Sequence, residues 1–225
     1  MKVLEVGGGG REHAIAWRLS RSPRIQKVFV APGNAGTALE PGLENIPITA
    51  ITELVAFVKQ ENIALTVVGP EAPLADGIVD RFRSEGLRVF GPTQKAAQLE
   101  ASKIFAKAFM QRYGISTANS ASFSQADAAH RYVDQISLPI VIKADGLAAG
   151  KGVVVAYSRD QAHEAVDYML KNSKLGKAGA QILIEDFLEG EEASFIVMAD
   201  GQHALPLATS QDHKRLLDND LGPNT

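Results

Sequence analysis

The sequence has 225 residues, of which 45% are hydrophobic and 22% charged, a balance typical of a soluble protein with one large core or two small ones. Its formal net charge of -3 offers no basic surface for nucleic acid or an anionic membrane, and the lack of cysteine excludes disulfides and thiolate metal sites. No apolar run is long enough to span a bilayer, and the first residues lack the apolar core and cleavage site of a signal peptide, so we expect a cytoplasmic protein without nucleic-acid or membrane partners.

The first hundred residues alternate short apolar runs with amphipathic stretches. Strands are predicted at residues 3–6, 28–31, 65–68 and 89–90, with helices beginning near Arg11, Ile51 and Asp76. Such alternation is typical of a parallel sheet with helices on both faces. The N-terminal part is therefore predicted to be an α/β domain with a doubly wound parallel sheet.

Glycine or proline turns follow these strands, at residues 7–10, 32–34, 69–71 and 91–92. Ligands of an open α/β sheet bind beyond the carboxyl ends of its strands, so these turns are predicted to share one crevice. The first turn also opens a helix, whose N-terminal N–H groups attract anions, and Arg11 adds donors suited to a phosphate.

The pattern changes after the first domain. Helices are predicted at 93–100 and 102–112, followed by helix 125–135, strands 140–143 and 153–156, helix 159–170 and strand 181–185. The elements from 125 onward predict a compact α+β unit, a second domain that begins near residue 115. A hairpin at 193–199 and 203–208 is predicted around Asp200-Gly201, and the polar terminus at 218–225 is either a frayed tail or a motif cut short.

The most informative segment is Lys143-Ala-Asp-Gly-Leu-Ala-Ala-Gly-Lys-Gly152, which directly follows the apolar run at 138–142. A lysine that ends a buried strand is expected to meet an anion there. Lys151, in a glycine-rich loop, suits a lid that closes over a terminal phosphate, so the segment predicts ATP chemistry. A P-loop does not fit, because only three residues separate the first glycine from the Gly-Lys pair, and a glycine stands where Ser or Thr would bind magnesium.

A third constellation lies at residues 181–194. A buried strand that runs into a short linker can offer a carbonyl and an N–H, two residues apart, to the amino edge of adenine. A carboxylate a few residues later can accept both ribose hydroxyls. The alternative is an acidic turn between two strands, and the lysine loop favours the nucleotide interpretation.

Motifs spread over the whole sequence carry a family resemblance. They are Gly-Gly-Arg-Glu-His-Ala at 9–14, Ala-Pro-Gly-Asn-Ala-Gly at 31–36, Val-Gly-Pro-Glu-Ala-Pro-Leu at 68–74, Ser-Lys at 102–103, the lysine loop at 141–153 and Gln-Asp-His-Lys-Arg at 211–215. Together they resemble the ATP-grasp ligases and, among these, the glycinamide ribonucleotide synthetase family. The resemblance implies a Rossmann-like substrate domain at 1–101, a helical linker at 102–120, an ATP-grasp lid subdomain at 121–190 and the truncated start of a second ATP-grasp subdomain at 191–225.

The resemblance also implies roles for individual residues. The nucleotide phosphates would be held by Lys103, Lys143 and Lys151, with Gly150 and Gly152 in the loop, and the adenosine by Glu185, Asp186, Phe187, Leu188 and Glu192. The Asp186 carbonyl and the Leu188 N–H would contact the adenine edge, and Glu192 the ribose. The phosphoribosylamine pocket would consist of Gly9, Gly10, Arg11, Asn34, Glu71 and Pro73, and the glycine end of Asp212, Lys214 and Arg215. Catalysis would depend on Lys143, Lys151 and Arg215.

The implied reaction belongs to de novo purine biosynthesis. Glycine would take the γ-phosphate of ATP to give glycyl phosphate and ADP, and the amine of 5-phosphoribosylamine would then displace phosphate. Lysines and magnesium would stabilise charge on the transferred group, and the closed lid would exclude water. The resemblance implies a monomer and places the magnesium ligands beyond Thr225, so no metal ligand is expected here and the 225-residue chain alone is expected to be inactive.

Other interpretations stay open. A related ATP-grasp ribonucleotide ligase or carboxylase would depend on a different substrate, such as bicarbonate. A non-catalytic ATP-binding fragment would bind the nucleotide without turnover. An NAD-dependent oxidoreductase fits least, because Glu12 or His13 occupies the third glycine position of the dinucleotide fingerprint, and no acidic residue ends the second strand.

Overall fold

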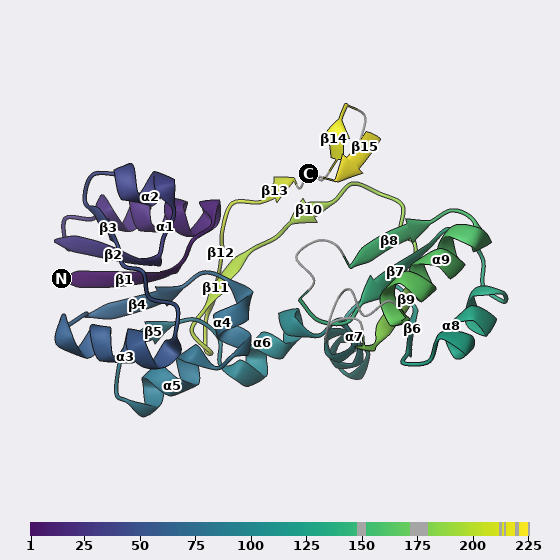
Figure 1. The fold of residues 1–225 in the computed structure, drawn as a ribbon, viewed down its shortest axis with the longest axis horizontal. Helices are drawn as coiled ribbons and strands as arrows, with labels where there is room; N and C mark the ends of the chain where they lie inside the picture. Colours follow the sequence, from purple (N-terminus) through teal and green to yellow (C-terminus); the bar gives the residue numbers. More distant parts are fainter. Residues whose placement is uncertain (148–151, 172–179, 212, 214, 219–220, 225) are drawn as a thin grey trace. The chain divides into compact units, whose positions relative to one another are not determined.

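The structure is a computed structural model that describes residues 1–147, 152–171, 180–211, 213, 215–218 and 221–224 (Figure 1). Its contacts divide the chain into two compact units, Met1–Asp186 and Phe187–Thr225. The first unit holds a parallel and an antiparallel sheet, and the second holds short antiparallel pairs, so the fold is the mixed α/β arrangement that the sequence predicts. No helix within the described ranges has the length and apolar composition of a membrane span.

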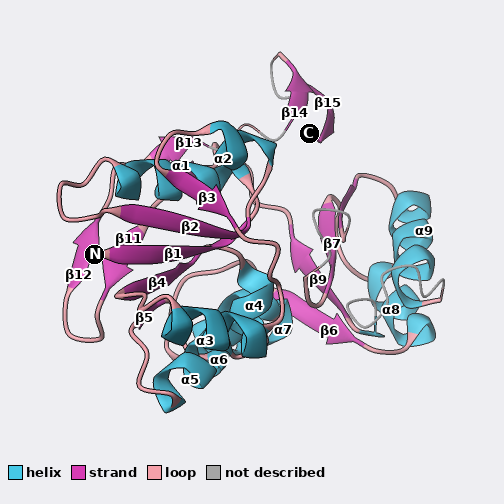
Figure 2. Cartoon of the chain, turned by 60° about the vertical axis from the view of Figure 1, so that its left-hand side comes forward, coloured by secondary structure: helices cyan, strands magenta, loops and turns pink. Residues whose placement is uncertain are grey.

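The first sheet is parallel, with the strand order β3-β2-β1-β4-β5 (Figure 2). Its strands are β1 Lys2–Gly7, β2 Lys27–Pro32, β3 Leu43–Asn45, β4 Leu65–Val68 and β5 Val89–Phe90. The strands other than β3 confirm the sequence prediction. The sequence does not predict β3, because this three-residue strand contains one apolar side chain, that of Leu43.

Helices cover both faces of this sheet, as Figure 2 shows. They are α1 Gly10–Ser20, α2 Ala35–Leu39, α3 Ile51–Gln60, α4 Glu71–Ala75, α5 Ile78–Ser84 and α6 Gln94–Ala101. On one face, Ala16 of α1 packs on Val28 and Val30 of β2. On the other face, Leu54 of α3 and Phe82 of α5 belong to a larger core. The doubly wound arrangement is therefore confirmed.

The short helices depart from the sequence prediction. α5 begins at Ile78, two residues after the predicted start near Asp76, because Asp76 caps the C-terminus of α4. Gly77, with a φ of 86°, then turns the chain, and this left-handed conformation suits a residue without Cβ. The five-residue helices α2 and α4 are not predicted, because they are too short to show a helical apolar period.

The second sheet is antiparallel, in the order β6-β9-β7-β8. Its strands are β6 Ser120–Phe123, β7 Ile140–Ala144, β8 Val153–Ala156 and β9 Ile182–Asp186, and the helices α8 Ala126–Val133 and α9 Arg159–Leu170 pack on it. Ala129 of α8 and Val166 of α9 share one core with Ile142 and Ile184. The sequence misses β6, whose single large apolar side chain is Phe123.

The opposite face of the second sheet carries charged residues. Lys143 of β7 lies opposite Leu183 of β9, and Val141 lies opposite Glu185. Because side chains alternate along a strand, Lys143 and Glu185 therefore share the face that α8 and α9 do not cover. Helix α7, Lys103–Arg112, contacts β9 and supplies further side chains to this face.

The second unit consists of short strands in its described part. They are β10 Ala193–Ser194, β11 Val197–Ala199, β12 Ala204–Pro206, β13 Ser210–Gln211, β14 Arg215–Leu217 and β15 Leu221–Asn224. β11 and β12 confirm the predicted hairpin, and the Asp200 carboxylate accepts the N–H groups of Gln202 and His203 in its turn at 2.9 and 2.7 Å. β15 lies within residues 218–225, where the sequence predicts a frayed tail or a motif cut short, and it pairs with β14.

Candidate functional site

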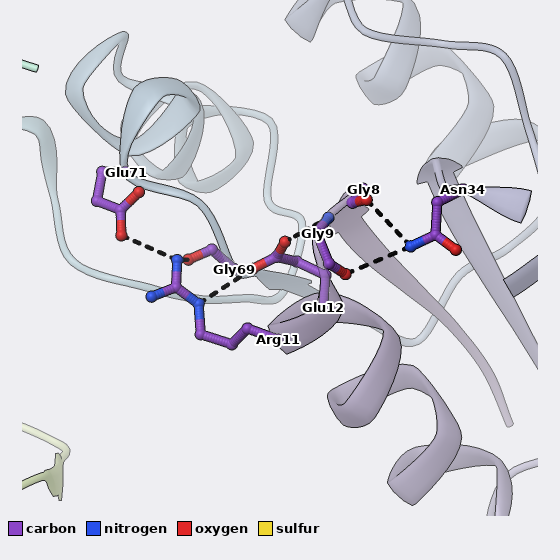
Figure 3. Close-up of polar contacts among 7 residues, drawn as sticks. All are labelled: Gly8, Gly9, Arg11, Glu12, Asn34, Gly69 and Glu71. Carbon is purple, nitrogen blue, oxygen red and sulfur yellow. Dashed lines mark hydrogen bonds and ion pairs between the residues drawn. The ribbon is translucent and has the colours of Figure 1, made fainter. Parts of the chain in front are cut away.

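The first glycine turn, at the end of β1, is filled by the side chain of Glu12. Its Oε2 accepts a hydrogen bond from the Gly9 N–H at 2.8 Å, and its Oε1 accepts one from Arg11 Nε at 3.1 Å (Figure 3). A Cβ on Gly7 or Gly69 would lie 2.3 or 2.4 Å from Glu12 Cγ, so both glycines make room for the carboxylate. Part of the anion site predicted from the sequence is therefore satisfied by the chain itself.

Arg11 links the first turn to the third. Its Nη2 donates to Glu71 Oε1 at 2.9 Å and to the Gly69 carbonyl at 3.2 Å (Figure 3). The hydrogen bond from Arg11 lowers the pKa of Glu71, and the same bond raises the pKa of Arg11, so both groups are charged at neutral pH. In the sheet, β2 and β3 follow β1 on one side, and β4 and β5 lie on its other side, so the strand order reverses between β1 and β4. The Arg11–Glu71 ion pair therefore lies at the switch point where α/β sheets bind ligands.

Asn34 ties the second turn to the first. Its Nδ2 donates to the carbonyls of Gly8 and Gly9 at 3.0 and 3.4 Å (Figure 3), and its Oδ1 accepts the Thr37 N–H at 2.9 Å as the N-cap of α2. A Cβ on Gly33 would lie 2.3 Å from the Asn45 side chain, which itself bonds the Asn34 carbonyl at 2.8 Å. The turns after β1, β2 and β4 are therefore joined by hydrogen bonds.

The other predicted residues of this site lie nearby in the chain. Gly10 is the first residue of α1, and Pro73 lies in α4, two residues after Glu71. A cavity of about 170 Å3, lined by Glu71, Leu74, Pro92 and residues of α6, connects the third turn with the fourth. The structure thus brings Gly9, Arg11, Asn34 and Glu71 together at the first three predicted turns, and the cavity adds Pro92 of the fourth.

Lys143, the next-to-last residue of β7, is paired with a carboxylate. Lys143 Nζ forms an ion pair with Glu185 Oε1, and Lys107 Nζ pairs with Glu185 Oε2 at 2.8 Å. Burial raises the pKa of Glu185, but the hydrogen bonds from Lys107 and Lys143 outweigh it, so the pKa of this carboxyl lies below its ordinary value. The cluster therefore contains two cations and one anion and keeps a net positive charge.

Lys107 is not predicted from the sequence as a residue of this site, because a lysine is usually a solvated surface charge. Here its side chain is 10% exposed, whereas that of Lys143 is 30% exposed. The signal that could have found it is its spacing: Lys107 follows Lys103 by four residues, so both lie on one face of α7.

The root of the lysine loop is fixed to the N-terminus of α7. Asp145 Oδ1 accepts hydrogen bonds from Ser102 Oγ and from the Ile104 N–H, both at 3.0 Å. Lys103 Nζ donates to the Gly146 carbonyl at 2.9 Å. Lys103, which sequence spacing alone supports weakly, therefore contacts the loop three residues after Lys143.

The two described ends of the loop lie close together. The Ala144 N–H donates to the carbonyl of Gly152 at 2.7 Å, and the Asp145 N–H donates to the carbonyl of Gln181 at 2.9 Å. Gly152 is buried. Gly150 and Lys151, predicted to lie over the γ-phosphate, fall outside the described residues.

The residues predicted to hold adenosine begin at the end of β9. The Asp186 N–H donates to the Asn119 carbonyl at 3.1 Å, and Asn119 Nδ2 donates to Asp186 Oδ2 at 2.8 Å, so this strand end is fixed on both sides. Phe187, Leu188 and Glu192 belong to the second unit. Of the predicted glycine end, Asp212 and Lys214 lie outside the described residues, and Arg215 begins β14.

The chain is similar to proteins of one family along its whole length. Family models described as the N domain and the ATP-grasp (A) domain of phosphoribosylglycinamide synthetase match residues 1–100 and 101–225. Proteins named phosphoribosylamine–glycine ligase from Neisseria meningitidis serogroup B and Escherichia coli K12 are 66% identical over 225 residues and 59% identical over 227 residues. Each comparison covers 100% of this chain and 53% of the relative, so the chain spans about half the length of these curated relatives.

Solved structures agree with this assignment. The crystal structure of a phosphoribosylamine–glycine ligase from Thermotoga maritima has a TM-score of 0.82 and 33% identity, and the match covers 100% of this chain and 54% of that one. The biotin carboxylase domain of a Hydrogenobacter thermophilus 2-oxoglutarate carboxylase has a TM-score of 0.74 at 17% identity over 97% of this chain and 51% of that one, a likeness of fold alone. The chain therefore belongs to the phosphoribosylglycinamide synthetase family.

Proposed function

We propose that the protein containing this chain is an ATP-dependent ligase that joins glycine to 5-phosphoribosylamine. The products are glycinamide ribonucleotide, ADP and phosphate, formed through glycyl phosphate in de novo purine biosynthesis. The observation that carries the proposal is that Lys103 donates to the carbonyl of Gly146, in the same glycine-rich loop that begins at Lys143. The names and identities of the relatives support the substrates.

The donors at the loop root fit the phosphates of ATP. Lys143 offers an ammonium group from a strand, and Lys103 offers one from a helix N-terminus. The carboxylate of Glu185 is shared between Lys107 and Lys143, so it neutralises only one of these two positive charges. ATP would supply the phosphoryl group, and the lysines would stabilise its negative charge without acting as nucleophiles. In the described part of the chain, no three His, Cys, Asp or Glu side chains form a group that could hold a metal ion.

The same proposal extends to the predicted pockets and domains. Phosphoribosylamine would bind to Gly9, Gly10, Arg11, Asn34, Glu71 and Pro73, and the adenosine to Glu185, Asp186, Phe187, Leu188 and Glu192. The reacting groups would meet Lys151, Asp212, Lys214 and Arg215. The guanidinium of Arg11 supports this, because its side chain is 59% exposed beside a helix N-terminus. We also propose the division into a substrate domain at 1–101 and ATP-grasp segments from 102 onward.

Substrate-dependent ADP release by the intact protein that carries this chain tests the proposal. We expect release that requires both glycine and 5-phosphoribosylamine, and loss of at least about a hundredfold in Lys143→Met. Lys2→Met is the matched control, because Lys2 also lies on a strand and pairs with a glutamate, Glu61, at 2.7 Å. Release that requires bicarbonate in place of glycine would instead identify a carboxylating enzyme.

A further inference from the structure

Lys107 has an unusual environment for a lysine. Its Nζ donates to Thr117 Oγ1 at 2.6 Å, to the Ala118 carbonyl at 2.9 Å and to Glu185 Oε2 at 2.8 Å. An ammonium group has three N–H donors, and each of these contacts uses one. Lys107 is therefore held in one place and has no donor left for a ligand.

Glu185 connects the fixed Lys107 ammonium to Lys143 of the candidate site. Its side chain is 6% exposed, and each of its carboxylate oxygens meets a different lysine, Oε2 the buried Lys107 and Oε1 the more exposed Lys143. A buried ionised carboxylate needs such partners, because removing one of them leaves a buried charge without compensation. In the part of the chain that the structure describes, Glu185 is the ionic partner of Lys143.

Lys143 remains able to bind a phosphate group. Its side chain is 30% exposed, and a single ion pair leaves N–H donors for another anion. A free lysine side chain has several rotatable bonds, and ordering them on binding costs affinity. A carboxylate that already holds the ammonium removes part of that cost.

We infer that Lys107 is a positioning residue, which holds Glu185 so that Glu185 holds the Lys143 ammonium where nucleotide phosphates bind. This inference deepens the proposed function and rests on it. Lys107 itself touches no ligand, and its effect passes through the carboxylate. The alternative is a purely structural role, in which Lys107 only fastens α7 to residues 117–118 and to β9.

A charge-matched double variant separates the two roles. Lys107→Met alone leaves Glu185 with one partner and makes the cluster neutral, which would weaken both folding and phosphate attraction. Adding Glu185→Gln removes the buried carboxylate, so the folding stability recovers in part and the net charge returns to that of the native cluster. What stays lost in the double variant is the anchored position of Lys143.

Calorimetry on the intact protein should use a hydrolysis-resistant ATP analogue and adenosine as probes. For the double variant Lys107→Met/Glu185→Gln we expect the affinity for the ATP analogue to fall about tenfold more than the affinity for adenosine, which Glu185 also helps to hold in the proposed site. Native affinity for the ATP analogue, or an equal loss for both probes that follows the melting temperature, would overturn the inference. If Lys143→Met leaves ATP-analogue binding unchanged, the proposed function fails first, and the inference fails with it.

Thr117→Val provides a milder version of the test, in case the charge variants do not fold. It removes one acceptor of the Lys107 ammonium and leaves every charge in place. We expect about a twofold loss of ATP-analogue affinity with adenosine binding unchanged. An ATP-analogue affinity equal to that of the native protein would count against a positioning role.

Discussion

At the residue scale, Glu5 is the least expected side chain of the first sheet. It lies in β1 opposite Val30, on the face that α1 covers, and it is fully buried. Within the described residues, neither of its carboxyl oxygens has a hydrogen-bond partner. Burial and, to a lesser extent, the nearby Glu12 raise the pKa of Glu5 to about 9 against a lowering effect of Arg11, so this carboxyl is neutral at physiological pH.

Replacing Glu5 with leucine is predicted to stabilise the fold. The unfolded chain releases the Glu5 proton near the ordinary pKa of 4.5, whereas the folded chain keeps it up to about pH 9. The free energy of unfolding therefore falls as the pH rises from 4.5 to about 9. Glu5→Leu, of similar volume, should raise the free energy of unfolding at pH 7 by about 3 kcal/mol and flatten its pH dependence. Urea unfolding at pH 5 and pH 8 measures this, with the exposed Glu53→Leu as control. An unchanged slope between the two pH values in Glu5→Leu would contradict the prediction.

At the element scale, the N-terminus of α7 and the root of the lysine loop share their caps. Ser102 Oγ accepts the Phe105 N–H at 3.0 Å and donates to Asp145, which also accepts the Ile104 N–H at 3.0 Å. Because Asp145 comes two residues after Lys143, this cap sets the position of Lys103, the first residue of α7, relative to the loop. Helix capping and site geometry are therefore coupled.

Asp145→Ala should weaken both the helix and the candidate site. Loss of a cap costs about 1–2 kcal/mol, and ATP-analogue affinity should also fall severalfold because Lys103 is no longer aligned with the loop. Ser158→Ala is the control, because Ser158 caps α9 by accepting the Gln161 N–H at 3.3 Å and lies away from the loop. Denaturant unfolding and calorimetry together decide. Equal effects of the two variants on nucleotide binding would show that the cap has no special role.

The same scale explains which elements can be predicted from the sequence. The long helices and the apolar strands follow from their periodicity, whereas β3, β6, α2 and α4 carry too few apolar residues to show a period. Some residues of the candidate site can likewise be predicted from the sequence, and others cannot. Arg11 and Lys143 lie at strand or helix ends that the sequence marks, but the burial of Lys107 depends on Glu185, 78 positions later in the chain.

At the scale of the whole molecule, each of the two sheets of the first unit buries a carboxyl group, but in a different environment. The first sheet buries the isolated Glu5, whereas the second buries Glu185 between Lys107 and Lys143. The pKa of the first carboxyl is therefore raised and that of the second lowered, although both are buried. The free energy of unfolding therefore changes with the titration of Glu185 below pH 4.5 and with that of Glu5 above pH 4.5.

This opposition predicts the pH at which the chain is most stable. Glu185 and Glu71, whose pKa values are lowered, stabilise the fold above 4.5, and that contribution is lost as the pH falls through their folded values. Glu5 destabilises it as the pH rises above 4.5. The free energy of unfolding should therefore be greatest near about pH 5. Denaturant titrations from pH 3 to pH 9 test this, and a maximum at pH 8 or above would contradict it.

The central claim is that Lys103 and Lys143 bind the phosphates of one nucleotide. Calorimetric affinities of the intact protein for adenosine, AMP, ADP and a hydrolysis-resistant ATP analogue test it most directly, in Lys103→Met, Lys143→Met and the control Lys2→Met. We predict native adenosine binding in all variants, and about tenfold or greater losses of affinity for ADP and the ATP analogue in Lys103→Met and Lys143→Met alone. Losses that are the same for adenosine and for the ATP analogue, or no loss in either lysine variant, would contradict it.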